Sequence, residues 1–264
     1  MKYKKPLKFS AAFSCPNSID IIDNMSLTCA GMEVSLTIIR YPRKYIFFAF
    51  LAMAIHRLPL YFNKTIHFYK LLGCGRNGAL DKIPDFQQWG VLAVHKPGPV
   101  LNLNKPYGSF ISSWLRIFNC EVWTVFLKPF EGHGSWDGKL VFGELPNHSD
   151  HEGMIAILTR ATIRLNKLKH FWRHIEPVST VMKAAPGFIT SVGIGEIPWI
   201  KQATFSVWES KESMKAFAYG MKVHTDVIKM TRDENWYSEE MFVRFKITGC
   251  TGSLRGINPL QGKY

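Results

Sequence analysis

Histidines in the second half of the chain are the side chains best suited to metal or cofactor chemistry. His170 and His174 are four residues apart, so they share one face of a predicted helix, an arrangement compatible with metal binding. Phe171 occupies the glutamate position of the zinc-hydrolase pattern H-E-x-x-H, which argues against zinc hydrolysis. Together with Trp172 it indicates a helix that packs mainly against a sheet, with both histidines at its polar edge.

A third histidine, His224, lies in a later predicted helix. Ser210 provides a polar N-cap, and Met214 and Phe217 follow it at near-helical spacing. These residues alone favour a surface histidine over a ligand. The helix by itself therefore assigns His224 no chemical role.

Polar side chains also occupy two predicted strands. Arg160 lies in the middle of the strand 155–164, where burying an unpaired arginine is costly. Its side chain either points into a cavity and pairs with an anionic group, or it faces solvent. The alternation of side chains along the strand does not decide between the two. Thr204, Ser206 and Trp208 share one face of a later strand, so we expect them to line one cavity with two hydroxyls and an aromatic wall.

Two other motifs are weaker. Residues 73–78 fit the G-x-G-x-x-G pattern, but Pro84 follows instead of the helix that a dinucleotide site needs, so a turn at a strand end is the simpler interpretation. Gly132-His-Gly134 and the pair His148 and His151 lie in a segment rich in Gly and His. Without a nearby cysteine or a fourth ligand, this segment indicates a solvated loop rather than a zinc site.

The elements that must position these residues occur twice. Each copy has a segment ending in Gly-x-Gly, then an Ile-Pro pair, then an apolar run. The strand and helix signals of each copy follow the order β-α-β-β-α-β. We therefore predict an α+β protein in which two ferredoxin-like halves form an internally duplicated dimeric-type α+β barrel. The matched segments are Val34–Ile39 with Ile155–Ile163, Phe68–Gly75 with Phe188–Gly195, and Glu121–Phe126 with Glu240–Phe245.

The boundaries follow from this repeat. The most apolar run, Tyr45–Ile55, is too short to cross a bilayer, and we expect it to be a buried helix. The predicted organisation is a disordered basic arm at 1–32, a first half at 33–130, a connection at 131–153, a second half with the candidate site at 154–247, and a C-terminal tail at 248–264.

The net charge of +13, from 33 basic and 20 acidic residues, favours an anionic partner. No zinc-finger, helix-turn-helix or RNP-like pattern accompanies the charge, so we do not expect nucleic acid to be that partner. The five cysteines are scattered and include no C-x-x-C pair, which is typical of a reducing compartment such as the cytoplasm.

A series of motifs in the second half resembles the spheroidene monooxygenase family of haem-dependent carotenoid oxygenases. The resemblance runs from about Glu33 to Ile247 and is densest after Met154. The motifs are Leu158–Arg164 (LTRATIR), Phe171–His174 (FWRH), Ser191–Glu196 (SVGIGE), Gln202–Glu209 (QATFSVWE), Phe217–Tyr219 (FAY), His224 and Trp236–Glu240 (WYSEE).

This resemblance implies haem b as cofactor. In similar haem enzymes with dimeric α+β barrels, such as chlorite dismutases and aldoxime dehydratases, the axial histidine commonly comes from a helix, which favours His224 as the iron ligand. We expect Trp208, Arg164 and Phe217 to join it in binding the cofactor. One of the histidines at 170 and 174 is a further candidate for the haem edge.

The resemblance also implies a reaction. We expect oxygen from O₂ to be inserted into an acyclic carotenoid or a similar apolar substrate, with Arg160, Ser206 and Thr204 as the catalytic polar groups and a ferredoxin-type electron donor. A cytoplasmic protein with peripheral contact to the inner face of the membrane fits such a substrate. The alternatives are a haem enzyme of another class, similar to aldoxime dehydratase, and a non-enzymatic haem- or ligand-binding barrel.

Overall fold

The computed structural model describes residues 31–76, 78, 81–97, 103–220, 229–231 and 233–263, with the backbone alone described at 175–179. The predicted basic arm at 1–32 therefore lies almost wholly outside the described residues. The same is true of His224. No helix in the described ranges is long and apolar enough to cross a membrane.

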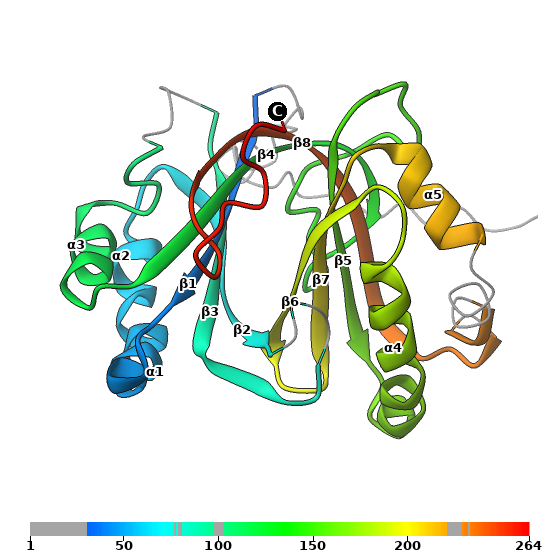
Figure 1. Cartoon of the computed structure of the whole chain (residues 1–264), viewed down its shortest axis with the longest axis horizontal. Coiled ribbons are helices and arrows are strands. Elements are labelled where there is room, and N and C mark those ends of the chain that lie inside the picture. Colours follow the sequence, from blue (N-terminus) through cyan, green and yellow to red (C-terminus); the bar gives the residue numbers. More distant parts are fainter. Residues whose placement is uncertain are drawn as a thin grey trace, which may run out of the picture.

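Eight antiparallel strands form a closed barrel (Figure 1). Their order around the barrel is β1-β3-β2-β6-β7-β5-β8-β4. The strands are β1 (Glu33–Arg40), β2 (Ile66–Gly75), β3 (Pro84–His95), β4 (Glu121–Gly134), β5 (Ile155–Ile163), β6 (Phe188–Ile197), β7 (Lys201–Trp208) and β8 (Tyr237–Gly252).

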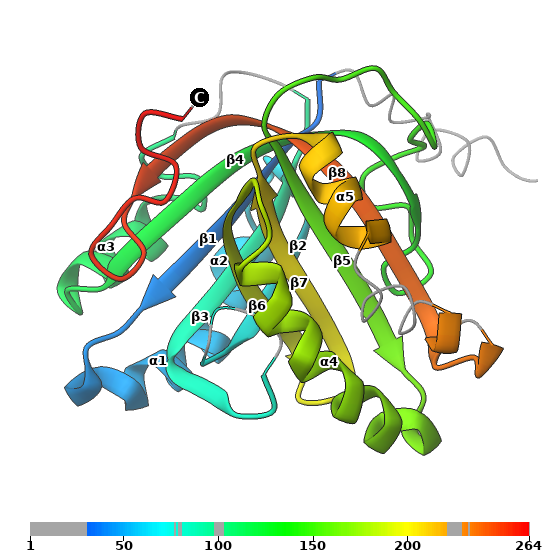
Figure 2. The same ribbon diagram turned by 45° about the vertical axis from the view of Figure 1, so that its right-hand side comes forward.

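The predicted duplication is confirmed. The first half has the sheet order β4-β1-β3-β2 and the second has β8-β5-β7-β6, which is the same order of equivalent strands. Helices of the two halves lie on opposite sides of the barrel, as Figures 1 and 2 show. The helices are α1 (Ile46–Ile55), α2 (Arg57–Tyr61) and α3 (Ser109–Ile117) in the first half, and α4 (Leu168–Lys183) and α5 (Lys211–Gly220) in the second.

The two halves are joined at two places, where a strand of one half pairs with a strand of the other. The β4–β8 pair is the long seam and the β2–β6 pair is the short seam. β4 pairs with β8 along a register running from Trp123–Gly252 to Gly134–Met241, whereas β2 and β6 pair only at Gly73–Gly195 and at the neighbouring residues. A Cβ at Gly195 would lie 2.9 Å from the Lys201 carbonyl oxygen, so a side chain does not fit there. The repeated Gly-x-Gly segments lie at this short seam, and the atoms that crowd Gly195 belong to the neighbouring strand β7.

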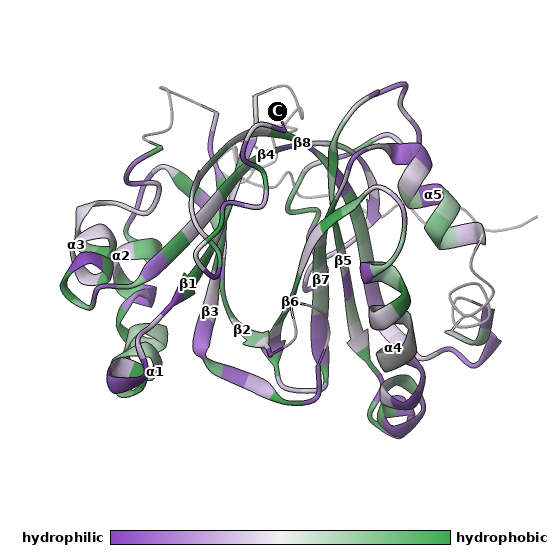
Figure 3. Cartoon of the chain, viewed as in Figure 1, coloured by the Kyte–Doolittle hydropathy of each residue, from purple (hydrophilic) through white to green (hydrophobic). Residues whose placement is uncertain are grey.

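Strand alternation divides the side chains between the barrel interior and the helices. Leu158, Phe205 and Val207 point inward and are almost fully buried in the interior core. Trp136 and Phe142, from the predicted connection, belong to the same core, so that segment is not simply a solvated loop. Figure 3 shows the resulting mixture of hydrophobic and hydrophilic residues along the strands.

The strands of the long seam continue beyond the predicted boundaries of the halves. β4 runs on to Gly134 and β8 to Gly252, because each supplies the other with backbone hydrogen-bond partners. The chain after β8 folds back on the barrel and buries Leu260 in the interior core.

The prediction of a buried helix at 45–55 is wrong. Only Ala49 and Ala52 of α1 are buried, and Phe47 is 72% exposed. An apolar sequence identifies the helix but cannot show how many of its faces are covered, and here only one face packs against the sheet.

Candidate functional site

The outer face of the second-half sheet carries a row of accessible side chains. Register places Thr204 beside Thr159, Thr159 beside Phe242, and Phe242 beside His133 across four strands. Thr159 and His133 are exposed, and the other two are partly buried. The His133 ring stacks on Phe242 at a centroid distance of 5.8 Å. A central strand of a helix-covered sheet is normally buried, so this row marks an incompletely covered surface.

The first half provides an internal comparison. Thr37 lies mid-strand in β1, between Val91 and Thr124, as Thr159 lies in β5. Thr37 is 1% exposed because Tyr107 covers it and donates a hydrogen bond of 2.7 Å to its hydroxyl. The same position is covered in one half and accessible in the other.

Helices α4 and α5 pack on either side of this row, toward opposite ends of the strands. On α5, Phe217 stacks on Trp208 with ring centroids 5.3 Å apart, and the Trp208 indole N–H donates to the Ser206 hydroxyl at 3.1 Å. On α4, Phe171 contacts Tyr237 at the far end of the sheet. The structure thus brings together three of the predicted site residues, Ser206, Trp208 and Phe217, on the same face as Thr204.

A buried ionic cluster borders this face. Glu131, only 2% exposed, accepts a hydrogen bond of 2.6 Å from the Lys211 ammonium and forms an ion pair with Arg244. Lys211 also donates to the Ser149 carbonyl oxygen at 2.6 Å. Two cations thus share one carboxylate, so the cluster as a whole carries excess positive charge.

Two buried nitrogens near this cluster have no hydrogen-bond partner among the described residues. They are Nε of Arg244 and Nε2 of His151, whose ring lies 4.6 Å from that of Phe130. Burial lowers the pKa of Arg244 from its usual value, which shows that its charge is poorly solvated. The unpaired Arg244 Nε–H and the excess positive charge beside this accessible face suit an anionic group such as a carboxylate.

Arg160 lies on the other face of the sheet. Its guanidinium, 1% exposed, donates to Glu239 at 2.6 Å, to Glu196 at 3.0 and 3.2 Å and to Asp137 at 3.2 Å, and it lies 5.0 Å from the centre of the Trp136 ring. It is therefore a paired arginine at the end of the barrel interior.

The pairing of β5 with β7 therefore places the predicted catalytic residues on opposite faces of the sheet. Arg160 pairs with Ala203 and shares the inward face with it, whereas Thr204 and Ser206 point toward the helices. No single cavity holds all three. The catalytic roles of these residues stay predictions, but only the two hydroxyls border the open face.

Two of the carboxylates around Arg160, those of Asp137 and Glu239, have pKa values below their usual range. Burial acts to raise the pKa of Asp137, but hydrogen bonds and charge from Lys201 and Lys70 outweigh it and hold the pKa at about 2. Burial likewise acts to raise the pKa of Glu239, but the Gly138 N–H, Arg160 and Ser135 lower it to about 2. Asp137 and Glu239 therefore stay charged at neutral pH and remain paired with Arg160.

The other predicted residues lie away from the open face. Arg164 is exposed just before α4, where its backbone N–H donates to the Trp236 carbonyl oxygen at 2.9 Å. His170 lies 3.8 Å from the Glu234 carboxylate, and the His174 ring lies 5.7 Å from Trp236. In the ranges that the structure describes, no three His, Cys, Asp or Glu side chains are grouped as metal ligands.

Comparison with known proteins assigns the family. The chain is 32% identical to spheroidene monooxygenase of Rhodobacter capsulatus over 216 residues, covering 80% of this chain and 88% of that protein. The chain belongs to the spheroidene monooxygenase family. The protein of that name from Cereibacter sphaeroides is also 32% identical, over 79% of this chain, but the match spans only 64% of its own length. The Rubrivivax gelatinosus protein matches at 32% identity over 72% of each chain.

Residues 154–245, nearly the whole second half, also match a family model described as a domain of unknown function, DUF3291. Among solved structures, an aldoxime dehydratase in complex with butyraldoxime superposes with a TM-score of 0.58 at 9% identity, covering 87% of this chain and 84% of that one. A second aldoxime dehydratase gives a TM-score of 0.53 at 10% identity, covering 82% and 81%. At such identities the likeness shows the shared α+β barrel fold alone.

Sequence reasoning missed the cluster of Glu131, Lys211 and Arg244. Arg244 lies mid-strand in the alternating run Met241–Phe245, which is the same signal that singled out Arg160. Its carboxylate partner could not be inferred because Glu131 is more than a hundred residues away and meets it only through the long seam.

We expect Glu131→Gln to lower the free energy of unfolding by about 3 kcal/mol or more, because two buried cations lose their shared counter-ion. Urea unfolding followed by tryptophan fluorescence measures the change. The matched control is Glu209→Gln, which removes an exposed pair with Lys263 at 3.4 Å and should cost less than about 1 kcal/mol. Equal effects of the two substitutions would contradict the cluster's buried character.

Asp137 and Glu239 predict a pH effect. Their folded-state pKa values, about 2, lie below the ordinary values of 3.8 and 4.5, so their ionisation stabilises the folded protein above about pH 4.5 and this contribution is lost as the pH falls toward 2. Partial exposure of both side chains reduces its size. The double variant Asp137→Asn, Glu239→Gln should lose less stability than the wild type between pH 5 and pH 2.5, and an identical loss in urea titrations at the two pH values would refute this.

Proposed function

We propose that this protein is a haem-dependent monooxygenase that inserts an oxygen atom from O₂ into an acyclic carotenoid or a similar apolar substrate. The relatives named spheroidene monooxygenase support the reaction and the substrate class. The observation that carries the cofactor assignment is the accessible outer face around Thr159, which is exposed, whereas its counterpart Thr37 is 1% exposed beneath Tyr107.

The residues of this face fit a haem. Phe242 provides a partly accessible aromatic floor, and the stacked rings of Trp208 and Phe217 are buried directly beside it in the core that supports this face. Arg244 offers an unpaired Nε–H donor for a propionate group, and the unpaired Nε2 of His151 lies near the same cluster. Bound haem supplies an iron centre that activates O₂ with electrons from a ferredoxin-type donor.

His224 is the proposed axial ligand. In the sequence it follows Phe217 by seven residues, and Met214 and Phe217 are the apolar residues that α5 buries against the sheet. His133, exposed on the same face and stacked on Phe242, is the alternative ligand that the structure offers.

The hydroxyls have distinct tasks in this proposal. The Ser206 oxygen accepts a hydrogen bond from Trp208, which leaves its own O–H proton available to donate toward the open face. Thr204 and Thr159 lie one row further along and are accessible. Such fixed donors in a largely apolar site stabilise charge that develops on an oxygen atom more strongly than water would. The apolar walls orient a polyene and exclude water.

Haem content tests the ligand. Protein produced in haem-sufficient cells should show a Soret band, which His224→Ala should abolish because the iron loses its axial bond. His170→Ala and His174→Ala are matched controls on α4 and should retain haem. A His224→Ala variant with an unchanged spectrum and haem content, together with loss of both in His133→Ala, would move the ligand to the sheet.

Isotope labelling tests the reaction. Reduced protein given ferredoxin-type electrons, ¹⁸O₂ and an acyclic carotenoid should form a hydroxy or keto product that carries the label. Ser206→Ala should lower turnover by roughly tenfold or more while haem content is retained, because one fixed donor is lost. Absence of label in any product, with dehydration of an aldoxime under reducing and oxygen-free conditions, would replace the oxygenase by a dehydratase.

A further inference from the structure

Helix α1 presents an apolar stripe to solvent. The exposed residues of the segment 47–58 recur at helical spacing and, apart from Arg57, are all apolar. Tyr61 and Phe62, directly after them, are 74% and 71% exposed. The stripe consists of Phe47, Phe50, Leu51, Ala54 and Leu58.

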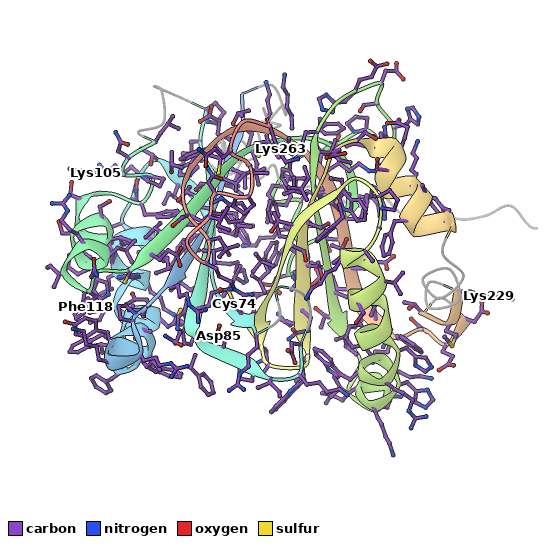
Figure 4. The ribbon with its side chains drawn as sticks, in the orientation of Figure 1. Cys74, Asp85, Lys105, Phe118, Lys229 and Lys263 are labelled. Atoms are coloured by element: carbon purple, nitrogen blue, oxygen red, sulfur yellow. The ribbon has the colours of Figure 1, made fainter. Side chains whose placement is uncertain are left out.

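Ring contacts extend this stripe into a continuous surface over α1 and α3. Phe47 contacts Phe48 at 5.6 Å, Phe48 stacks on Phe118 at 4.5 Å, and Phe118 contacts Trp114 at 4.8 Å. Figure 4 places Phe118 among the side chains on this outer side of the barrel. Ile117 of α3, 72% exposed, adjoins these rings in sequence. Monomeric proteins rarely expose so large a contiguous apolar area without a partner.

The fold itself does not require this surface. Helix α4 is the counterpart of α1 in the second half, and its exposed residues are mostly polar or charged. Among the α4 residues whose side chains the structure describes, they are Lys169, His170, Arg173, Thr180 and Lys183. Because the two helices cover equivalent sheets, the apolar exterior of α1 is a property of this element and not of the barrel.

Charge around the surface has one sign. Exposed basic residues flank the stripe at both ends, and between Val34 and Cys120 the only acidic residues are Asp81 and Asp85, of which Asp85 pairs with Arg40 at 2.9 Å. The flanking residues are Arg43, Lys44, Arg57, Lys64 and Arg116. An apolar face rimmed by cations complements a layer of anionic headgroups above hydrocarbon.

We propose that α1, α2 and the adjoining end of α3 form a docking surface for an anionic lipid bilayer. The helix α1, ten residues long, extends for about 15 Å, half the hydrocarbon thickness, so it lies in the plane of the interface. Its aromatic side chains enter the acyl region, and the basic rim contacts phosphate groups. The surface lies on the opposite side of the barrel from α5 (Figures 1 and 2), and its role does not depend on the cofactor or substrate of the second half.

Vesicle sedimentation tests this surface with the full-length protein. The wild type should bind vesicles of phosphatidylcholine mixed with phosphatidylglycerol, and added salt should weaken binding because the headgroup attraction is screened. The combined variant Phe47→Ser, Leu58→Ser, Phe62→Ser should lower the partition coefficient more than about tenfold. The double variant Arg43→Ser, Lys44→Ser should lower it roughly tenfold for mixed vesicles and little for phosphatidylcholine alone.

A matched control carries Leu165→Ser, Tyr219→Ser and Ile257→Ser, three apolar residues of similar exposure elsewhere on the molecule. It should bind mixed vesicles as the wild type does, and circular dichroism should show all variants folded. The proposal is overturned if the wild type binds neither vesicle type, or if the control loses binding to the same extent. It is also overturned if the Phe47 variant only converts a dimer to a monomer in light scattering, since a second copy of the chain would then cover the surface.

Discussion

Antiparallel pairing around a closed barrel is the constraint on which the rest of this structure depends. Once β4 pairs with β8 and β2 with β6, every strand residue faces either the barrel interior or the helices, and the alternation leaves no third choice. The inward side is filled by large side chains such as Phe205 and Phe245, so the barrel is a packed core.

The outer sheet faces of the two halves are covered by different side chains and helices. In the first half, Tyr107 and the aromatic residues of α1 and α3 cover the sheet, and the surplus apolar surface of α1 points outward. In the second half, α4 and α5 leave Thr159 accessible between them. The duplicated halves have equivalent outer sheet faces, but different side chains and helices cover them. The first half carries the proposed membrane surface, and the second half carries the proposed haem site.

Buried charge reinforces the long seam on both of its sides. Glu131 of β4 binds Arg244 of β8 on the outer side, and on the inner side Arg160 of β5 pairs with Glu239 of β8 and with Asp137, which follows β4. Removing one member of such a cluster leaves the others uncompensated, so these pairs tie the two halves together more firmly than exposed pairs could. The residues that border the candidate site are thus also residues that hold the halves in register.

The sequence alone determined the duplicated β-α-β-β-α-β order, because Gly-x-Gly, Ile-Pro and strand alternation are local patterns, and its motifs indicated the family. Because side chains alternate along a strand, the sequence also placed Thr204, Ser206 and Trp208 on one face. Only the tertiary structure decided which face meets the helices, since register between distant strands depends on pairing across the whole chain. That is why Arg160 lies on the inward side with its carboxylates, and why α1, although apolar throughout, is exposed: hydrophobicity is a property of residues, whereas burial depends on what packs against them.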